Sequence, residues 1–146
     1  MNIPINNHAP AIATNQIFIN APVDTVWKIL TDINNWTSWQ KDVTRAVVRG
    51  NVQEGALFEW KAGGLSFKSK IHTSKPMSMF GWTGTTIGAS AIHNWFFESV
   101  HNGTQVKVEE SLQGIFPKLL SKYFQKNLNS GVIKNLEELK AAAESR

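Results

Sequence analysis

The clearest absence in this chain of 146 residues is cysteine, which occurs nowhere in it. Disulfide bonds and thiolate metal sites are therefore excluded, and a chain of this length can bury a sufficient core without them. Because the absence of cysteine fits a reducing compartment, we expect a cytoplasmic protein. We also expect a single domain over residues 1–146, in which residues 1–10 form a loose, polar lead-in.

Long apolar runs and the signatures of common catalytic sites are missing as well. No run reaches the roughly 18 residues that span a bilayer, so we expect no integral membrane segment. The N-terminus also lacks the basic and apolar regions of a signal peptide. The chain has no H-E-x-x-H, G-x-S-x-G, G-x-G-x-x-G or P-loop motif, so the sequence predicts neither a metal nor a cofactor.

Neither sign of charge is in strong excess. The chain has 15 Lys and Arg against 11 Asp and Glu, a formal net charge of +4. Lys118, Lys122 and Lys126 form an i, i+4 row, which we interpret as a solvated helix face. The alternative for this row is a surface for anionic membranes or acidic ligands. Because arginine is not clustered, nucleic acid is not an expected partner.

Aromatic residues are abundant: the chain has 6 tryptophans and 8 phenylalanines. They recur in nearly every segment with the alternation of a strand, where such rings either fill a core or line a pocket. Alternation and turn signals predict seven antiparallel strands at about 11–20, 43–49, 56–62, 65–74, 78–87, 90–100 and 104–113. Helical spacing predicts a helix at about 22–32, a short helical turn at 34–39 and one long helix over 116–143. This order of elements is typical of the α+β class.

The segment around the first helix carries the most specific pattern. Pro22 suits the first helical position and Asp24 the first turn, ahead of apolar residues at helical spacing. Residues 19–39 match I-x-A-P-x-x-x-V-W-x-x-L-x-D-x-x-x-W-x-x-W. This pattern resembles the signature of the START-like (SRPBCC) superfamily, which includes the polyketide cyclase/dehydrase-like and Bet v 1-like proteins.

The resemblance covers about residues 11–143 and implies a helix-grip fold. In that fold a seven-stranded antiparallel sheet wraps around a long C-terminal helix, with two short helices between strands 1 and 2. The resemblance further implies an apolar cavity between sheet and helix. A small hydrophobic molecule is the partner that such a cavity implies.

The last two strands hold the candidate polar residues. With period-2 alternation, His93, Trp95 and Phe97 share one face, and the superfamily's H-x-W-x-F stretch implies that this face is concave. Glu110 shares a face with apolar neighbours and is expected inward. Pairing around an Asn102-Gly103 turn puts Trp95 opposite Glu110, with His93 on the diagonal.

We therefore hypothesise that His93 and Glu110 form the polar end of an apolar pocket. They could orient a ligand hydroxyl or carbonyl, or act as an acid–base pair. A buried polar pair that touches no substrate is the alternative. The remaining expected ligand-binding residues are Trp39, Phe58, Trp60, Phe67, Trp82, Trp95, Phe97, Phe116, Leu120, Phe124 and Leu128.

Three functions remain open from the sequence. The first is a binder or carrier of a lipid, a polyketide-like ring compound or an isoprenoid, acting as a monomer or weak homodimer. The second is a cyclase or dehydratase that uses His93 and Glu110 in the same pocket. The third is a co-chaperone-like protein-interaction module whose cavity is filled by its own aromatics. Two minor expectations are that His72 points to solvent and that Gly131 marks close packing, a bend or room for a ligand.

Overall fold

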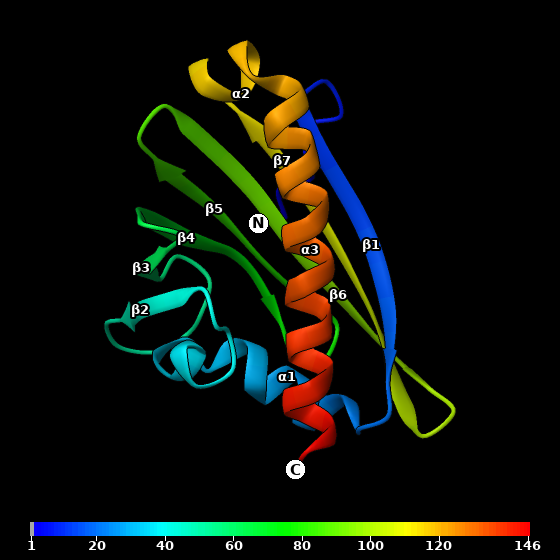
Figure 1. Ribbon diagram of the computed structural model, residues 1–146. Helices are drawn as coiled ribbons and strands as arrows, with labels where there is room; N and C mark the ends of the chain where they lie inside the picture. The colour runs from blue at the N-terminus through cyan, green and yellow to red at the C-terminus, as the bar shows by residue number, and fades with distance from the viewer. Residues whose placement is uncertain (1) are drawn as a thin grey trace.

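A seven-stranded antiparallel sheet curves around one long helix (Figure 1). The computed structural model describes residues 2–146. The strand order is β1-β7-β6-β5-β4-β3-β2. The strands are β1 (Ala11–Ile19), β2 (Val43–Val48), β3 (Leu57–Ala62), β4 (Leu65–Lys75), β5 (Met79–Thr86), β6 (Ala89–Val100) and β7 (Gly103–Gln113). The α+β helix-grip fold expected from the sequence is confirmed, and the expected strands are present with only small shifts at their ends.

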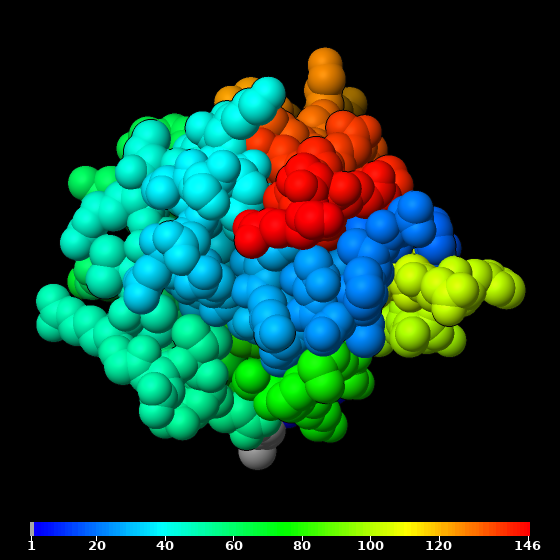
Figure 2. All heavy atoms as spheres, turned by 90° about the horizontal axis from the view of Figure 1, so that it is seen from below, coloured from blue at the N-terminus to red at the C-terminus, as the bar shows by residue number. Residues whose placement is uncertain are grey.

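Two short helices, α1 (Val23–Thr31) and the 3₁₀ helix η1 (Ile33–Ser38), connect β1 to β2. Pro22 precedes α1 as its N-cap residue, one position before the place that the sequence suggested. The buried face of α1 packs on the sheet, and Trp36 of η1 is buried beside it. The Trp36 indole N–H donates to the carbonyl oxygen of Leu30 at 2.8 Å, which fixes η1 against α1. Seen from below, the C-terminal end of the long helix lies beside α1 and the η1–β2 region (Figure 2).

The C-terminal helical region is divided in two, where the sequence predicted one helix from residue 116. Helix α2 (Ile115–Leu119) ends at Leu120, whose φ of −120° and ψ of 45° leave the helical range, and α3 (Ser121–Glu144) follows. The division has a physical cause at the turn between β5 and β6. Phe116 packs on Gly88, where an added Cβ would lie 2.3 Å from its ring, and the Phe116 N–H donates to the Gly88 carbonyl. Helix α2 therefore follows this turn instead of the axis of α3.

The predicted apolar face of the long helix is correct only from its middle onward. Leu128, Val132, Leu136 and Leu139 are buried against the sheet. Phe116 and Leu120, two of the expected ligand-binding residues, are exposed because they belong to α2 and to the break. Gly131 has open space where a Cβ would stand, so close packing does not explain it.

Helix α3 also runs along the free edge of β1 (Figure 1). The Gln125 side-chain amide bonds both backbone groups of Ile12: its oxygen accepts from the N–H, and its nitrogen donates to the carbonyl. Near the other end of β1, Lys140 donates to the carbonyl of Phe18. The Asn20 N–H donates to the carboxylate of Glu144. Helix side chains therefore satisfy part of an edge that has no neighbouring strand.

The N-terminal segment is held against the outer face of the sheet, so the expectation of a loose lead-in is wrong for residues 3–6. The Ile3 N–H donates to His72 Nδ1 at 3.2 Å, and Asn94 Nδ2 donates to the Ile3 carbonyl at 2.8 Å. The Asn6 N–H donates to Ser111 Oγ at 3.1 Å. These bonds join the segment to three strands of the sheet.

His72 lies beneath this segment and is buried, which corrects the expectation that it faces solvent. His72 lies on the outer face because it alternates with Lys68 and Lys70, at an irregularity in the register of β4 between Ile71 and Thr73. The N-terminal segment covers it there, so little of it reaches solvent. Its Nε2 lies 2.7 Å from Asn94 Oδ1, across strand β5. Gly81 of β5 leaves room for this contact, since a Cβ there would lie 2.5 Å from both side chains.

Candidate ligand-binding site

The β6–β7 hairpin determines where His93 and Glu110 meet. His101 and Asn102 are the central turn residues, with φ of 50° and 66°, and Val100 pairs with Gly103. The predicted Asn102-Gly103 turn was therefore displaced by one residue. With the turn at His101-Asn102, the β7 partner of each β6 residue shifts by two residues. His93 therefore lies directly opposite Glu110, and the predicted diagonal placement is wrong. Residues with positive φ at both central positions form the turns that match strand twist, and Asn favours this conformation.

His93 and Glu110 form a close polar pair on the inner face of the sheet. His93 Nδ1 lies 3.3 Å from Glu110 Oε1, and the two side chains are 6% and 14% exposed. Burial raises the pKa of Glu110 from 4.5 to about 8 and lowers the pKa of His93 from 6.5 to about 3. Both groups are therefore neutral at pH 7. The protonated carboxyl can then donate to His93 Nδ1, which leaves the imidazole proton on Nε2.

Two buried nitrogens at this site have no hydrogen-bond partner among residues 2–146: Nε2 of His93 itself and Nε1 of the neighbouring Trp95. The imidazole lies between two indoles, stacked on Trp95 at 5.5 Å between ring centroids and tilted against Trp82 at 4.5 Å. A buried donor without an acceptor costs about 1–3 kcal/mol. An oxygen acceptor placed here would remove this cost, so the site is suited to a hydroxyl or carbonyl oxygen.

Aromatic rings fill much of the inner face next to the pair. Trp36 contacts Phe58, Trp60 and Trp82, with centroid distances between 5.4 and 5.7 Å. Trp27 contacts Phe97 at 5.4 Å. Trp27 and Trp36 come from α1 and η1, and neither belongs to the predicted set of lining residues. Only the packing of α1 and η1 on the sheet brings them to these rings.

The predicted ligand-binding residues fall into three groups. Six are buried: Phe58, Trp82, His93, Trp95, Phe97 and Leu128. Five are partly buried: Trp39, Trp60, Phe67, Glu110 and Phe124. The remaining two, Phe116 and Leu120, are exposed. The structure brings His93, Glu110, Trp82 and Trp95 together. Trp60 and Phe67 stack on each other at 4.4 Å, closer to the β3–β4 turn. Trp39 instead lines a separate hollow beside the C-terminal half of α3.

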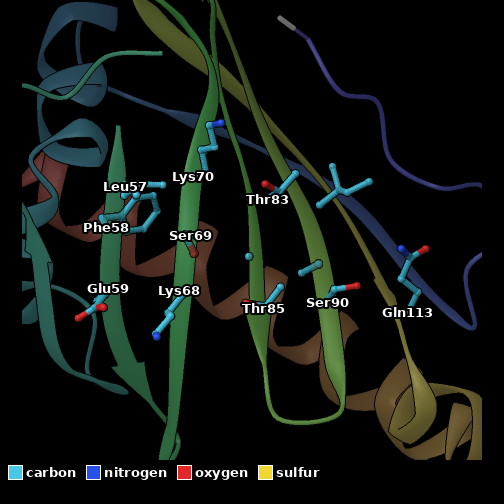
Figure 3. A pocket seen from close by; sticks show the side chains of 13 residues that line it. Leu57, Phe58, Glu59, Lys68, Ser69, Lys70, Thr83, Thr85, Ser90 and Gln113 are labelled. Atoms are coloured by element: carbon cyan, nitrogen blue, oxygen red, sulfur yellow. The ribbon is translucent and has the colours of Figure 1, made fainter. Parts of the chain in front are cut away.

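A further hollow of about 460 Å³ lies over strands β3 to β6. Figure 3 shows its lining with α3 behind the sheet, so this hollow is on the outer face. Lys68, Lys70, Thr83 and Thr85 contribute side chains to it, and they alternate along their strands with the inward residues. Of the predicted ligand-binding residues, Phe58 alone belongs to this lining.

The described part of the chain contains neither a cluster of metal-binding side chains nor a membrane-spanning helix. Residues 2–146 contain no group of three or more His, Cys, Asp or Glu side chains that could hold a metal ion. Over the same residues, no helix has the length and apolar character needed to cross a membrane.

Comparison with known proteins identifies relatives at the level of family and fold. The family model described as "Polyketide cyclase / dehydrase and lipid transport" matches residues 10–144. No curated protein matches the chain. Among solved structures, the hypothetical protein jhp0584 from Helicobacter pylori has a TM-score of 0.83 at 16% identity, covering 94% of this chain and 90% of that one.

Two other solved structures have the same fold. Protein TTHA0849 from Thermus thermophilus has a TM-score of 0.77 at 18% identity, covering 92% of this chain and 97% of that one. The di-domain ARO/CYC protein StfQ from the steffimycin biosynthetic pathway has a TM-score of 0.79 at 17% identity. The match covers 93% of this chain and 51% of StfQ, about half of that two-domain protein.

Proposed function

Because the chain belongs to the polyketide cyclase / dehydrase and lipid transport family, we propose that it binds a small hydrophobic or amphipathic molecule between the sheet and α3. A lipid, a polyketide-like ring compound or an isoprenoid has the required chemistry. The apolar part of the ligand lies against the aromatic side chains of the inner face, and its oxygen lies at His93 and Trp95. Buried apolar surface contributes roughly 25 cal/mol per Å² to such binding.

The observation that carries this proposal is the pair of unpartnered donors, His93 Nε2 and Trp95 Nε1, on the inner face beside Glu110. Donors of this kind are rare in a plain hydrophobic core because each raises the free energy of the folded state. A neutral oxygen acceptor suits them better than a ligand carboxylate, because a charged carboxylate would lose its hydration at this buried place, the same effect that raises the pKa of Glu110.

A matched pair of probes tests the proposal. 2-Acetonaphthone and 2-ethylnaphthalene have closely similar shapes, but only the ketone carries an acceptor oxygen. The ketone is expected to bind about ten-fold more tightly, as one net hydrogen bond of about 1 kcal/mol and the relief of a buried donor imply. In Trp95→Phe, which keeps a ring and removes the N–H, this preference should shrink. Trp27→Phe is the control, since Trp27 lies on α1 outside the donor pair. Equal affinity of both probes for the wild-type protein would contradict the proposal.

An enzymatic role in the same site is the second candidate, favoured by one specific observation. A carboxyl group whose pKa is raised to about 8 is protonated at neutral pH and can act as a general acid. In a dehydratase, Glu110 would give its proton to the departing hydroxyl, which leaves as water when the C–O bond breaks. The Glu110 carboxylate would then take the proton from the α-carbon as the C=C bond forms, and His93 would hold the carboxyl in place through Nδ1. Glu110→Gln should then abolish dehydration of a β-hydroxy ketone while the affinity for 2-acetonaphthone is retained. Parallel loss of binding and turnover would contradict a chemical role for Glu110.

The dense packing around Trp36 favours a third candidate, a protein-interaction module with a filled interior. Native mass spectrometry of freshly purified protein separates this candidate from the first. A bound apolar molecule at one equivalent supports the ligand-binding proposal. A clean mass, together with no affinity for either naphthalene probe, supports the filled interior.

A further inference from the structure

The α2 end of the molecule carries an apolar surface that nothing in residues 2–146 covers. Ile87 of the β5–β6 turn is 74% exposed and Leu119 of α2 is 71% exposed. Ile115, Leu120 and Tyr123 beside them are also more than half exposed. We call these five residues the α2 patch. They are close in space because Phe116 packs on Gly88, the residue after Ile87.

The charge around the α2 patch has one sign. Lys118, Lys122 and Lys126 are exposed on α2 and the first turns of α3, and no carboxylate of the described residues pairs with them. The sequence contains no Asp or Glu from residue 111 to residue 136. The stretch from residue 60 to residue 97, which includes the β3–β4 and β5–β6 turns at the same end of the sheet, also contains none.

Six of the 11 acidic residues lie toward the opposite end of the molecule, where basic residues accompany them: Lys134 pairs with Asp42, and Lys140 pairs with Glu144. Asp24, Asp32 and Asp42 lie on or next to α1 and η1, and Glu137, Glu138 and Glu144 lie in the C-terminal half of α3. Figure 1 shows α2 at one end of α3, and α1 at the other end beside the C-terminus. The α2 end therefore combines exposed apolar side chains with lysines that pair with no carboxylate, whereas the opposite end carries both signs of charge.

From this arrangement we infer that the α2 end docks on an anionic lipid bilayer surface. Aliphatic side chains and a tyrosine at a protruding tip can enter the headgroup region, while flanking lysines pair with anionic lipids and keep their ammonium groups in water. The end that carries these carboxylates points away from such a surface, so only the α2 end presents lysines without nearby carboxylates to the lipids. The inference does not rest on the proposed function, because docking needs no ligand in the interior.

Sedimentation with vesicles tests this inference on the full chain. The probes are vesicles of phosphatidylcholine alone and of equimolar phosphatidylcholine and phosphatidylglycerol. We expect binding to the anionic vesicles, weakening as salt is added, and little binding to the neutral ones. Lys118→Glu/Lys122→Glu should lower the partition coefficient at least twenty-fold, because each lysine at an anionic surface contributes about five-fold. Lys28→Glu/Lys75→Glu makes the same charge change away from the α2 patch and should retain most of the binding.

The apolar contribution needs a separate variant. Ile87→Asn/Leu119→Asn alters two exposed side chains, so the fold should persist, as circular dichroism and thermal melting can verify. Loss of anionic-vesicle binding in this variant supports insertion of the patch. Equal loss in the control pair Lys28→Glu/Lys75→Glu, or no wild-type binding to anionic vesicles, overturns the inference. A concentration-dependent dimer that Leu119→Asn abolishes, without vesicle binding, would assign the patch to a second copy and also overturn it.

Discussion

Glu110 and His93 predict an unusual dependence of stability on pH. Glu110 has its pKa raised to about 8 in the folded protein, so between pH 4.5 and pH 8 the folded state holds a proton that the unfolded state has released. His93 has its pKa lowered to about 3, so between pH 3 and pH 6.5 the unfolded state holds a proton that the folded state lacks. Stability rises with pH where the unfolded state binds more protons, and it falls where the folded state binds more.

The two effects oppose each other between pH 4.5 and pH 6.5, because one proton is gained and one is lost on unfolding. The contribution of the pair to the free energy of unfolding is therefore flat in this window. Above pH 6.5 only Glu110 contributes, and the free energy falls by at most about 1.4 kcal/mol per pH unit until pH 8. The expected loss between pH 6.5 and pH 8 is thus no more than about 2 kcal/mol. Below pH 4.5 only His93 contributes, and stability falls again toward pH 3.

Urea unfolding followed by tryptophan fluorescence at pH 5.5, 6.5 and 8 measures this directly. Glu110→Gln removes the titrating group and should abolish the loss above pH 6.5. Glu109→Gln is the matched control: Glu109 is the next residue on β7, paired with Lys107 at 3.8 Å, and its replacement should leave the loss in place. If Glu110→Gln shows the same decline as the wild-type protein between pH 6.5 and pH 8, burial does not keep Glu110 protonated and the reasoning is refuted.

Three further predictions concern stability. Gly131→Ala should raise the free energy of unfolding by about 1 kcal/mol, because the added Cβ meets no atom within 4 Å in α3; an unchanged melting temperature would contradict this. Gly81→Ala should lower the free energy of unfolding by at least about 1–3 kcal/mol, because its Cβ would displace the side chains of His72 and Asn94, which hold the N-terminal segment. Hydrogen exchange at the Ile3 amide should become faster, and slow exchange there would contradict the prediction. Trp36→Phe should lower the free energy of unfolding by about 1–3 kcal/mol, because the buried carbonyl of Leu30 loses its hydrogen-bond donor. Urea unfolding measures this, and a smaller loss would indicate that water replaces the indole N–H.

The sequence predicted the local elements well because their signals are local. Alternation and glycine-containing turns located the strands, and helical spacing located α1 and the buried half of α3. The register of β6 and β7 was harder, since His101-Asn102 and Asn102-Gly103 are both plausible turn centres. The structure uses the first, and His93 then lies directly opposite Glu110. The inward direction of Glu110 followed from its alternation with apolar neighbours, and that of His93 from alternation together with the H-x-W-x-F stretch of the superfamily. The pair was therefore predicted despite the wrong register.

Contacts between distant segments account for what the sequence did not predict. The break at Leu120 depends on Phe116 packing against Gly88, which is far away in the chain. The burial of His72 depends on Ile3, on Asn94 and on the missing side chain of Gly81. A single sequence carries no periodic signal for such contacts. The same reason explains the aromatic contacts of Trp27 and Trp36, which depend on how α1 and η1 pack on the sheet.

The contacts of α3 with β1 have a consequence for self-association. An uncovered strand edge is a template for pairing with another chain, and proteins protect such edges by bulges, charges or covering elements. Here Gln125 occupies the backbone groups of Ile12, and Lys140 occupies the Phe18 carbonyl. The other edge strand, β2, is short and has an irregular register between Val43 and Arg45. Helix α3 therefore protects the edge of β1 from pairing with a strand of another molecule. Loss of its hydrogen bonds to β1 would favour aggregation through that edge even if the sheet itself stayed intact.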